Sequence, residues 1–143
     1  MGSLGTIVSS RASHSAQRLP SLTVMIVEDE ALIALSLEEA CEDEGHRVSG
    51  PFSSCADALA ALATAAPDLA ILDATLRDGS CLELARELRR RGVAFLIYSG
   101  RNAIEEYEPE LGDTPWINKP SPSDVVLRAA STLLKRDAPG AWQ

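Results

Sequence analysis

Strand-like and helix-like patterns alternate along the central part of the chain, and this alternation restricts the fold more than any other feature. Short apolar runs that suit buried strands occupy residues 22–27, 47–52, 68–73, 93–99 and 116–118. Helical periodicity is found at residues 30–44, 55–66, 81–91 and 121–136. Strands that alternate with helices favour an α/β fold, in which helices cover both faces of one parallel sheet.

The segment 101–115 interrupts this regularity. It is acidic and contains Pro109, Gly112 and Pro115, which disfavour a helix through a missing amide donor or excess backbone freedom. We therefore expect the fourth helix of the alternation to be short or irregular, near residues 102–108.

Length, charge and cysteine content narrow the class of protein. The 143 residues suit one domain, expected at 22–136, between a flexible N-terminal tail (1–21) and a C-terminal tail (137–143). Acidic residues outnumber Lys and Arg by 21 to 13, which disfavours nucleic acid as a partner. No run reaches the roughly 18 apolar residues of a membrane span. Three dispersed cysteines without a CxxC pair favour reduced thiols in a cytoplasmic protein.

Five side chains able to do chemistry stand at or just beyond the ends of predicted strands. Glu28 and Asp29 come after the first strand, Asp73 ends the third, Ser99 ends the fourth, and Lys119 follows the fifth. In doubly wound parallel sheets, functional groups gather beyond the carboxyl ends of the strands, where the strand order reverses. In the flavodoxin-like order 2-1-3-4-5, that point lies between the first and third strands. We therefore expect these groups to converge at one edge of the sheet.

Such a set of groups suits phosphoryl chemistry with a metal ion. Mg²⁺ prefers oxygen ligands, commonly one or two carboxylates with water and a phosphate oxygen. Lys119 cannot bind a metal, but its ammonium group can neutralise the charge of a phosphoryl group. An aspartate can attack phosphorus and form an aspartyl-phosphate, and Asp73 has the position for this nucleophile. The hydroxyl of Ser99 is able to bond a phosphoryl oxygen.

Each of these residues alone also has a simpler interpretation. The acids at 28–30 could merely stabilise the N-terminus of the following helix, where carboxylates interact favourably with the helix dipole. Asp73 alone could form a turn, Ser99 could be a turn hydroxyl, and Lys119 could be a surface lysine. The functional interpretation therefore depends on the whole set.

Four sequence motifs resemble the successive signatures of response-regulator receiver domains of two-component signalling. They are "VMIVEDE", "LAILDATLRDGS", "FLIYSG" and "INKP", and the resemblance covers residues 22 to about 136. The sequence of these motifs also resembles that of the stand-alone receivers of alphaproteobacteria, although "VAFLIYSG" matches their fourth-strand motif only in part. The resemblance implies a flavodoxin-like (βα)5 fold, a doubly wound parallel sheet of five strands.

The resemblance also implies a role for each site residue. Glu28 and Asp29 would hold Mg²⁺ together with Asp73, which takes the phosphoryl group. Thr75 would give the metal its backbone carbonyl, and Lys119 would contact the phosphoryl group.

Two further residues would take part in switching. Ser99 would also contact the phosphoryl group, and Trp116 matches the aromatic switch position, although it could be an ordinary core residue. The peptide bond before Pro120 is commonly cis in such domains.

The expected function is that of a single-domain response regulator, not an enzyme, with no remaining chain for an output domain. A histidine kinase or histidine phosphotransfer protein would phosphorylate Asp73 in a phosphorelay, and the signal would pass on through a changed surface. The downstream protein target is not specified, and the resemblance is compatible with a homodimer.

Two alternatives belong to other classes of protein. Mg²⁺-dependent phosphohydrolases also use a strand-end aspartate nucleophile, but they carry a second aspartate two residues later as general acid, where this chain has Thr75. The other alternative is a receiver-like interaction module that is never phosphorylated.

Overall fold

The sheet of the computed structural model has the predicted strand order. The structure describes residues 21–100, 110–111 and 113–137. Its main sheet is parallel, with the order β2-β1-β3-β6-β7, which is 2-1-3-4-5 in the chain order of these strands. The strands are β1 (Thr23–Val27), β2 (Arg47–Phe52), β3 (Leu69–Leu72), β6 (Ala94–Ser99) and β7 (Trp116–Asn118). The flavodoxin-like α/β prediction is therefore confirmed.

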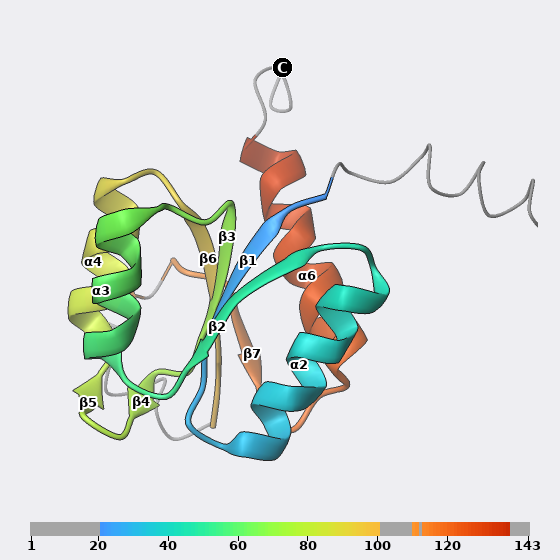
Figure 1. The fold of residues 1–143 in the computed structure, drawn as a ribbon, viewed down its shortest axis with the longest axis horizontal. Coiled ribbons are helices and arrows are strands. Elements are labelled where there is room, and N and C mark those ends of the chain that lie inside the picture. The colour runs from blue at the N-terminus through green and yellow to red at the C-terminus, as the bar shows by residue number, and fades with distance from the viewer. Residues whose placement is uncertain (1–20, 101–109, 112, 138–143) are drawn as a thin grey trace, which may run out of the picture.

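Two pairs of helices cover the two faces of this sheet (Figure 1). One face packs against α2 (Ala31–Asp43) and α6 (Ser123–Asp137), and the other against α3 (Cys55–Thr64) and α4 (Leu82–Arg90). The sequence predicts all four within about two residues at each end. The irregular fourth helix predicted near 102–108 lies outside the described residues, as do almost all of the two predicted tails. None of the described helices is long and apolar enough to cross a membrane.

The central strand β1 shows why a continuous apolar run was needed. Met25 and Val27 enter the core layer beneath α3 and α4, whereas Val24 and Ile26 enter the layer beneath α2 and α6. All four side chains are fully buried. A strand covered on both faces must be apolar at every position, and this separates it from the alternating pattern of a half-exposed strand.

Residues 74–80, between the third predicted strand and the helix predicted at 81–91, contain a small antiparallel hairpin. Its strands are β4 (Thr75–Leu76) and β5 (Gly79–Ser80), which form a separate two-stranded sheet. Leu76 is buried in the core layer beneath α3 and α4 and anchors the hairpin there. The Asp78-Gly79 pair marks the turn, and Gly79 has a φ of 129°, which a residue with a side chain rarely adopts.

The structure also corrects the predicted start of the last helix. Ser121, the first residue of the predicted range, lies before the helix, and its hydroxyl donates to the carbonyl of Asn118. The first helical hydrogen bonds go to the carbonyl of Pro122, which accepts from the amides of Val125 and Val126. The helix therefore begins at Ser123, two residues after its predicted start.

Gly50 provides a test of the packing between β1 and β2. The register shifts there, because β2 has one more residue than β1 between two paired positions, and Gly50 has a φ of 101°. A Cβ atom on Gly50 would lie 2.9 Å from the carbonyl oxygen of Ile26 and 2.7 Å from the amide nitrogen of Phe52. Only glycine fits this approach of the two strands.

We predict that Gly50→Ala lowers the free energy of unfolding by more than Gly45→Ala does, as measured by urea denaturation. Gly45 has a φ of 85° but open space around it, so its substitution adds only backbone strain, about 1–2 kcal/mol. Overpacking at Gly50 should add about 1–3 kcal/mol. Equal losses for the two variants would show that the strands relax freely at this point.

Candidate functional site

The carboxyl ends of four strands bring the predicted site residues together. Glu28 and Asp73 come directly after β1 and β3, Ser99 is the last residue of β6, and Lys119 follows β7. Backbone hydrogen bonds continue past the strand ends: the amide of Asp73 donates to the carbonyl of Val27, and the amide of Lys119 donates to the carbonyl of Ser99, each at 2.9 Å. The sheet itself therefore fixes the backbone from which these side chains project.

Lys119 is the centre of the charged network. Its Nζ lies 2.8 Å from Oδ2 of Asp73, 2.8 Å from Oε1 of Glu28 and 2.9 Å from Oε2 of Glu30. The side chain of Lys119 is only 13% exposed. One ammonium group thus pairs with three carboxylates, and the lysine side chain that carries it is largely shielded from water.

The second oxygen of Asp73 is held by different donors. The hydroxyl of Ser99 donates to Oδ1 at 2.6 Å, and the amide of Thr75 donates to the same oxygen at 3.2 Å. Asp73 and Ser99 are both buried. Both carboxylate oxygens therefore have hydrogen-bond donors, which orient the carboxylate toward the edge of the sheet.

Burial and charge act against each other at this site. Burial raises the pKa of Glu28 to about 6, and the charge of Asp73 adds to the rise, although hydrogen bonds from Lys119 and the Glu30 amide oppose it. Burial alone would lower the pKa of Lys119, but its hydrogen bonds to Asp73, Glu28 and Glu30 outweigh this and raise the pKa. Lys119 is therefore a permanent positive charge at neutral pH.

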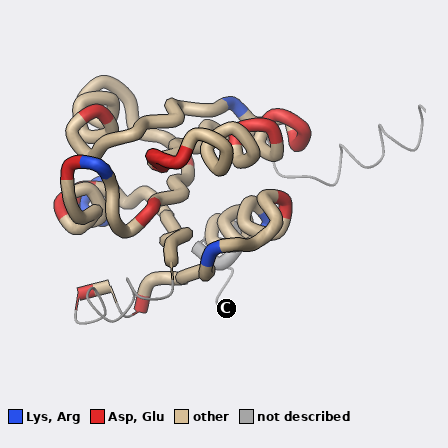
Figure 2. Tube along the Cα trace, turned by 90° about the horizontal axis from the view of Figure 1, so that it is seen from below, with Lys and Arg blue, Asp and Glu red and all other residues tan. Residues whose placement is uncertain are grey.

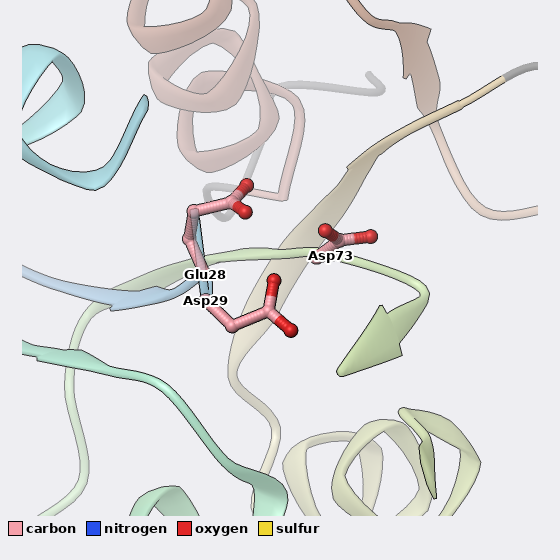
Figure 3. A group of neighbouring side chains, drawn as sticks. All are labelled: Glu28, Asp29 and Asp73. Atoms are coloured by element: carbon pink, nitrogen blue, oxygen red, sulfur yellow. The ribbon is translucent and has the colours of Figure 1, made fainter. Parts of the chain in front are cut away.

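Three acidic side chains lie together in a way that fits a divalent cation. Glu28, Asp29 and Asp73 each offer a carboxylate oxygen, and these oxygens lie within 4.8 Å of one another (Figure 3). They come from the ends of the neighbouring strands β1 and β3. Oxygen ligands of this kind suit Mg²⁺, which takes one or two carboxylates and completes its octahedron with water or phosphate oxygens.

Glu30 and Tyr98 belong to this site, although the sequence analysis gave them no role. Glu30 precedes α2 without capping it, since its side chain makes no capping bond and instead contacts Lys119. The ring of Tyr98 lies 5.7 Å from the Lys119 ammonium, and its hydroxyl donates to the carbonyl of Ser121 and accepts from the Ser121 amide. Glu30 could have been found from the sequence, because it is the third acid of "VEDE". Nothing in the sequence indicates the role of Tyr98, which lies in a buried strand.

Trp116 lies at the start of β7, paired in register with Ile97 and packed against the core layer beneath α3 and α4. Its indole nitrogen is buried and has no hydrogen-bond partner among the described residues. This placement agrees with the core interpretation, and the switch role stays a prediction. The predicted cis bond between Lys119 and Pro120 is confirmed.

The arginines of α4 and its C-terminus do not form an unpaired cationic face among the described residues. Acidic positions outnumber basic ones along the described chain (Figure 2). These arginines are paired with acids: Arg90 and Arg91 with Glu87, Arg86 with Glu110, and Arg89 with Asp113. This pairing disfavours nucleic acid binding at this helix.

Comparison with known proteins gives one consistent family. The family model of the response regulator receiver domain matches residues 24–130. The "Probable transcriptional regulatory protein TcrX" of Mycobacterium tuberculosis is 33% identical over 119 residues, which are 78% of this chain and 50% of TcrX. This chain spans about half the length of the curated relatives it matches.

Solved structures agree with this result. The solution structure of SdrG from Sphingomonas melonis Fr1 matches with a TM-score of 0.69 and 33% identity, over 80% of this chain and 97% of SdrG. A response regulator receiver protein from Sinorhizobium medicae WSM419 matches with a TM-score of 0.72 and 28% identity, over 82% of this chain and 98% of that protein.

The network around Lys119 leads to a prediction about stability. Lys119→Met should lower the free energy of unfolding by about 3–5 kcal/mol without Mg²⁺, because it leaves buried carboxylates without their counter-charge. Arg86→Met is a matched control, because it breaks the exposed pair with Glu110 and should cost at most about 1 kcal/mol. Urea denaturation measures both.

Added Mg²⁺ should recover part of the loss in Lys119→Met and raise its melting temperature more than that of the unsubstituted protein. A cost for Lys119→Met no larger than that for Arg86→Met would contradict the role of Lys119 as counter-charge.

Proposed function

Because the chain belongs to the response regulator receiver domain family, we propose that it accepts a phosphoryl group on Asp73 from a histidine kinase or a histidine phosphotransfer protein. The observation that carries the proposal is the setting of Asp73. Its carboxylate is buried at the carboxyl end of β3, between the hydroxyl of Ser99 and the ammonium of Lys119, and beside two further acids. This is the donor set that a phosphoryl group on Asp73 needs.

In the proposed reaction, one carboxylate oxygen of Asp73 attacks the phosphorus of a phosphohistidine. The new O–P bond forms as the N–P bond to the donor breaks, and the histidine nitrogen leaves with its electron pair. Lys119 and Ser99, which hold the two oxygens of Asp73 beforehand, then bond oxygens of the phosphoryl group. Their positions are set in advance, so little reorganisation is needed.

Glu28, Asp29 and Asp73 are proposed to hold Mg²⁺, with the backbone carbonyl of Thr75 as a further ligand. The ion would neutralise negative charge on the phosphoryl oxygens, which Lys119 alone cannot balance beside three acids. Burial raises the pKa of Glu28, and the charge of Asp73 adds to the rise; a divalent cation beside the carboxylate would favour its ionised form.

The proposed output is a change of surface near β6 and β7. Ser99 ends β6 and Lys119 follows β7, so a phosphoryl group that takes over the bonds of both side chains would change the surface at these two strand ends. Trp116 at the start of β7 is proposed to report or transmit that change. We propose a signalling role for a domain of residues 22–136, with a downstream protein as the target.

We predict that acetyl phosphate and Mg²⁺ add one phosphoryl group to the protein, measured as an increase in intact mass. Asp73→Asn should abolish the increase, because the amide is not a nucleophile, and EDTA should suppress it. Asp68→Asn is the matched control and should label normally, because Asp68 lies just before β3, at its other end, where it accepts from the amide of Thr23.

The same experiment separates the alternatives. Labelling that stops at one group per chain supports a phosphoacceptor. Rapid, continued release of phosphate from acetyl phosphate indicates a phosphohydrolase, and no labelling with any donor indicates an interaction module. Normal labelling of Asp73→Asn would overturn the assignment of the acceptor.

A further inference from the structure

We infer that Asp78 is a positioning residue for phosphorylation: by binding the N-terminus of α3, it fixes the hairpin that follows Asp73 and so helps to orient the phosphoacceptor. This inference rests on the proposed function of Asp73. The carboxylate of Asp78 accepts from the amide of Cys55 at 2.9 Å through Oδ1 and from the amide of Ala56 at 3.0 Å through Oδ2.

These bonds complete the N-terminus of α3 from a distant part of the chain. A helix leaves its first amides without intrahelical partners. Ser54, the residue before the helix, accepts from the amide of Asp57 at 3.1 Å and satisfies one of them. The two amides before that one point to Asp78, whose negative charge is favoured at a helix N-terminus. The same two bonds hold the pKa of Asp78 below its usual value.

The contacts seen between the hairpin and other described residues are few besides these two bonds. Of residues 75–80, only Leu76 is buried, while the other five residues are exposed. Besides Asp78, the end of α3 makes one more bond to the hairpin, from Sγ of Cys55 to the carbonyl of Ser80 at 3.2 Å. A two-stranded hairpin is marginal by itself, so its attachment to α3 decides how well it is placed.

The hairpin in turn contacts the phosphoacceptor. Its first residue, Thr75, donates its amide to Oδ1 of Asp73, the oxygen that also accepts from Ser99. The amide of Cys81 donates to the carbonyl of Ala74 at 2.9 Å and closes the base of the hairpin. A short, hydrogen-bonded path therefore leads from the end of α3 through Asp78 to the Asp73 carboxylate. Loss of the Asp78 bonds should let the Thr75 amide move away from Asp73.

The test compares two variants that each remove cap bonds from the same helix end. Asp78→Ala breaks the link to the hairpin, whereas Ser54→Ala removes a cap bond without touching the hairpin. Both should lower the melting temperature. With acetyl phosphate and saturating Mg²⁺, at a temperature where both variants are folded, Asp78→Ala should label Asp73 on the order of tenfold more slowly, because small misplacements of reacting groups are costly. Ser54→Ala should label at the normal rate.

Amide exchange gives a readout that does not depend on phosphorylation. Asp78→Ala should increase exchange at the Thr75 amide, and Ser54→Ala should not. If Asp78→Ala does not fold, Asp78→Asn takes its place, because an amide has only one acceptor oxygen and loses at least one of the two bonds.

Equal labelling rates in the two variants, or unchanged exchange at Thr75, would overturn the positioning role. Failure of the proposed function is distinguishable from this result, because the unsubstituted protein would then not label at all, while Thr75 exchange would still respond to Asp78.

Discussion

The structure depends on one charge balance, that of Lys119 with the acids at the carboxyl edge of the sheet. Glu28 and Asp73 are 3% and 6% exposed, and like charges so close together are costly to bury. The ammonium group of Lys119 lies 2.8 Å from each of these carboxylates and offsets their repulsion. Glu30, at the surface, makes a third contact with the same ammonium group. The remaining excess of negative charge is of the kind that a divalent cation would balance, and in the proposed function the lysine also binds the phosphoryl group.

The parallel sheet places the charged residues of this balance next to one another. In a parallel sheet all strands end at the same edge, so residues 28, 73, 99 and 119, far apart in the sequence, become neighbours. The apolar runs that form β1 and β3 supply the buried scaffold, and their last backbone hydrogen bonds extend to the functional residues. The same residues that fill the core therefore determine where the acids lie. A shift of one strand relative to its neighbour would therefore change the distances between these side chains.

The sequence was sufficient to predict the elements that have a regular hydrophobic pattern and the residues at which such a pattern ends. The strand order, four helices and the convergence of Glu28, Asp73, Ser99 and Lys119 followed from hydrophobic periodicity and from the resemblance to receiver domains. It was insufficient for contacts between distant residues that have no local pattern. Asp78 accepts from two amides of α3 that lie 22 and 23 positions earlier in the chain, and no local pattern indicates this contact. Glu30 was recognised as a helix-end charge, but it meets Lys119 across 89 positions.

In the proposed function the side chain of Asp73, and no other group at this edge of the sheet, carries the phosphoryl group. Borohydride reduces an acyl phosphate to an alcohol, so that a phosphorylated aspartate becomes homoserine, which peptide mass spectrometry locates. After treatment with acetyl phosphate and Mg²⁺, and then with borohydride, we expect homoserine at position 73 alone. Reduction at Glu28 or Asp29, or a phosphoryl group on Ser99 that resists borohydride as an ester does, would contradict it.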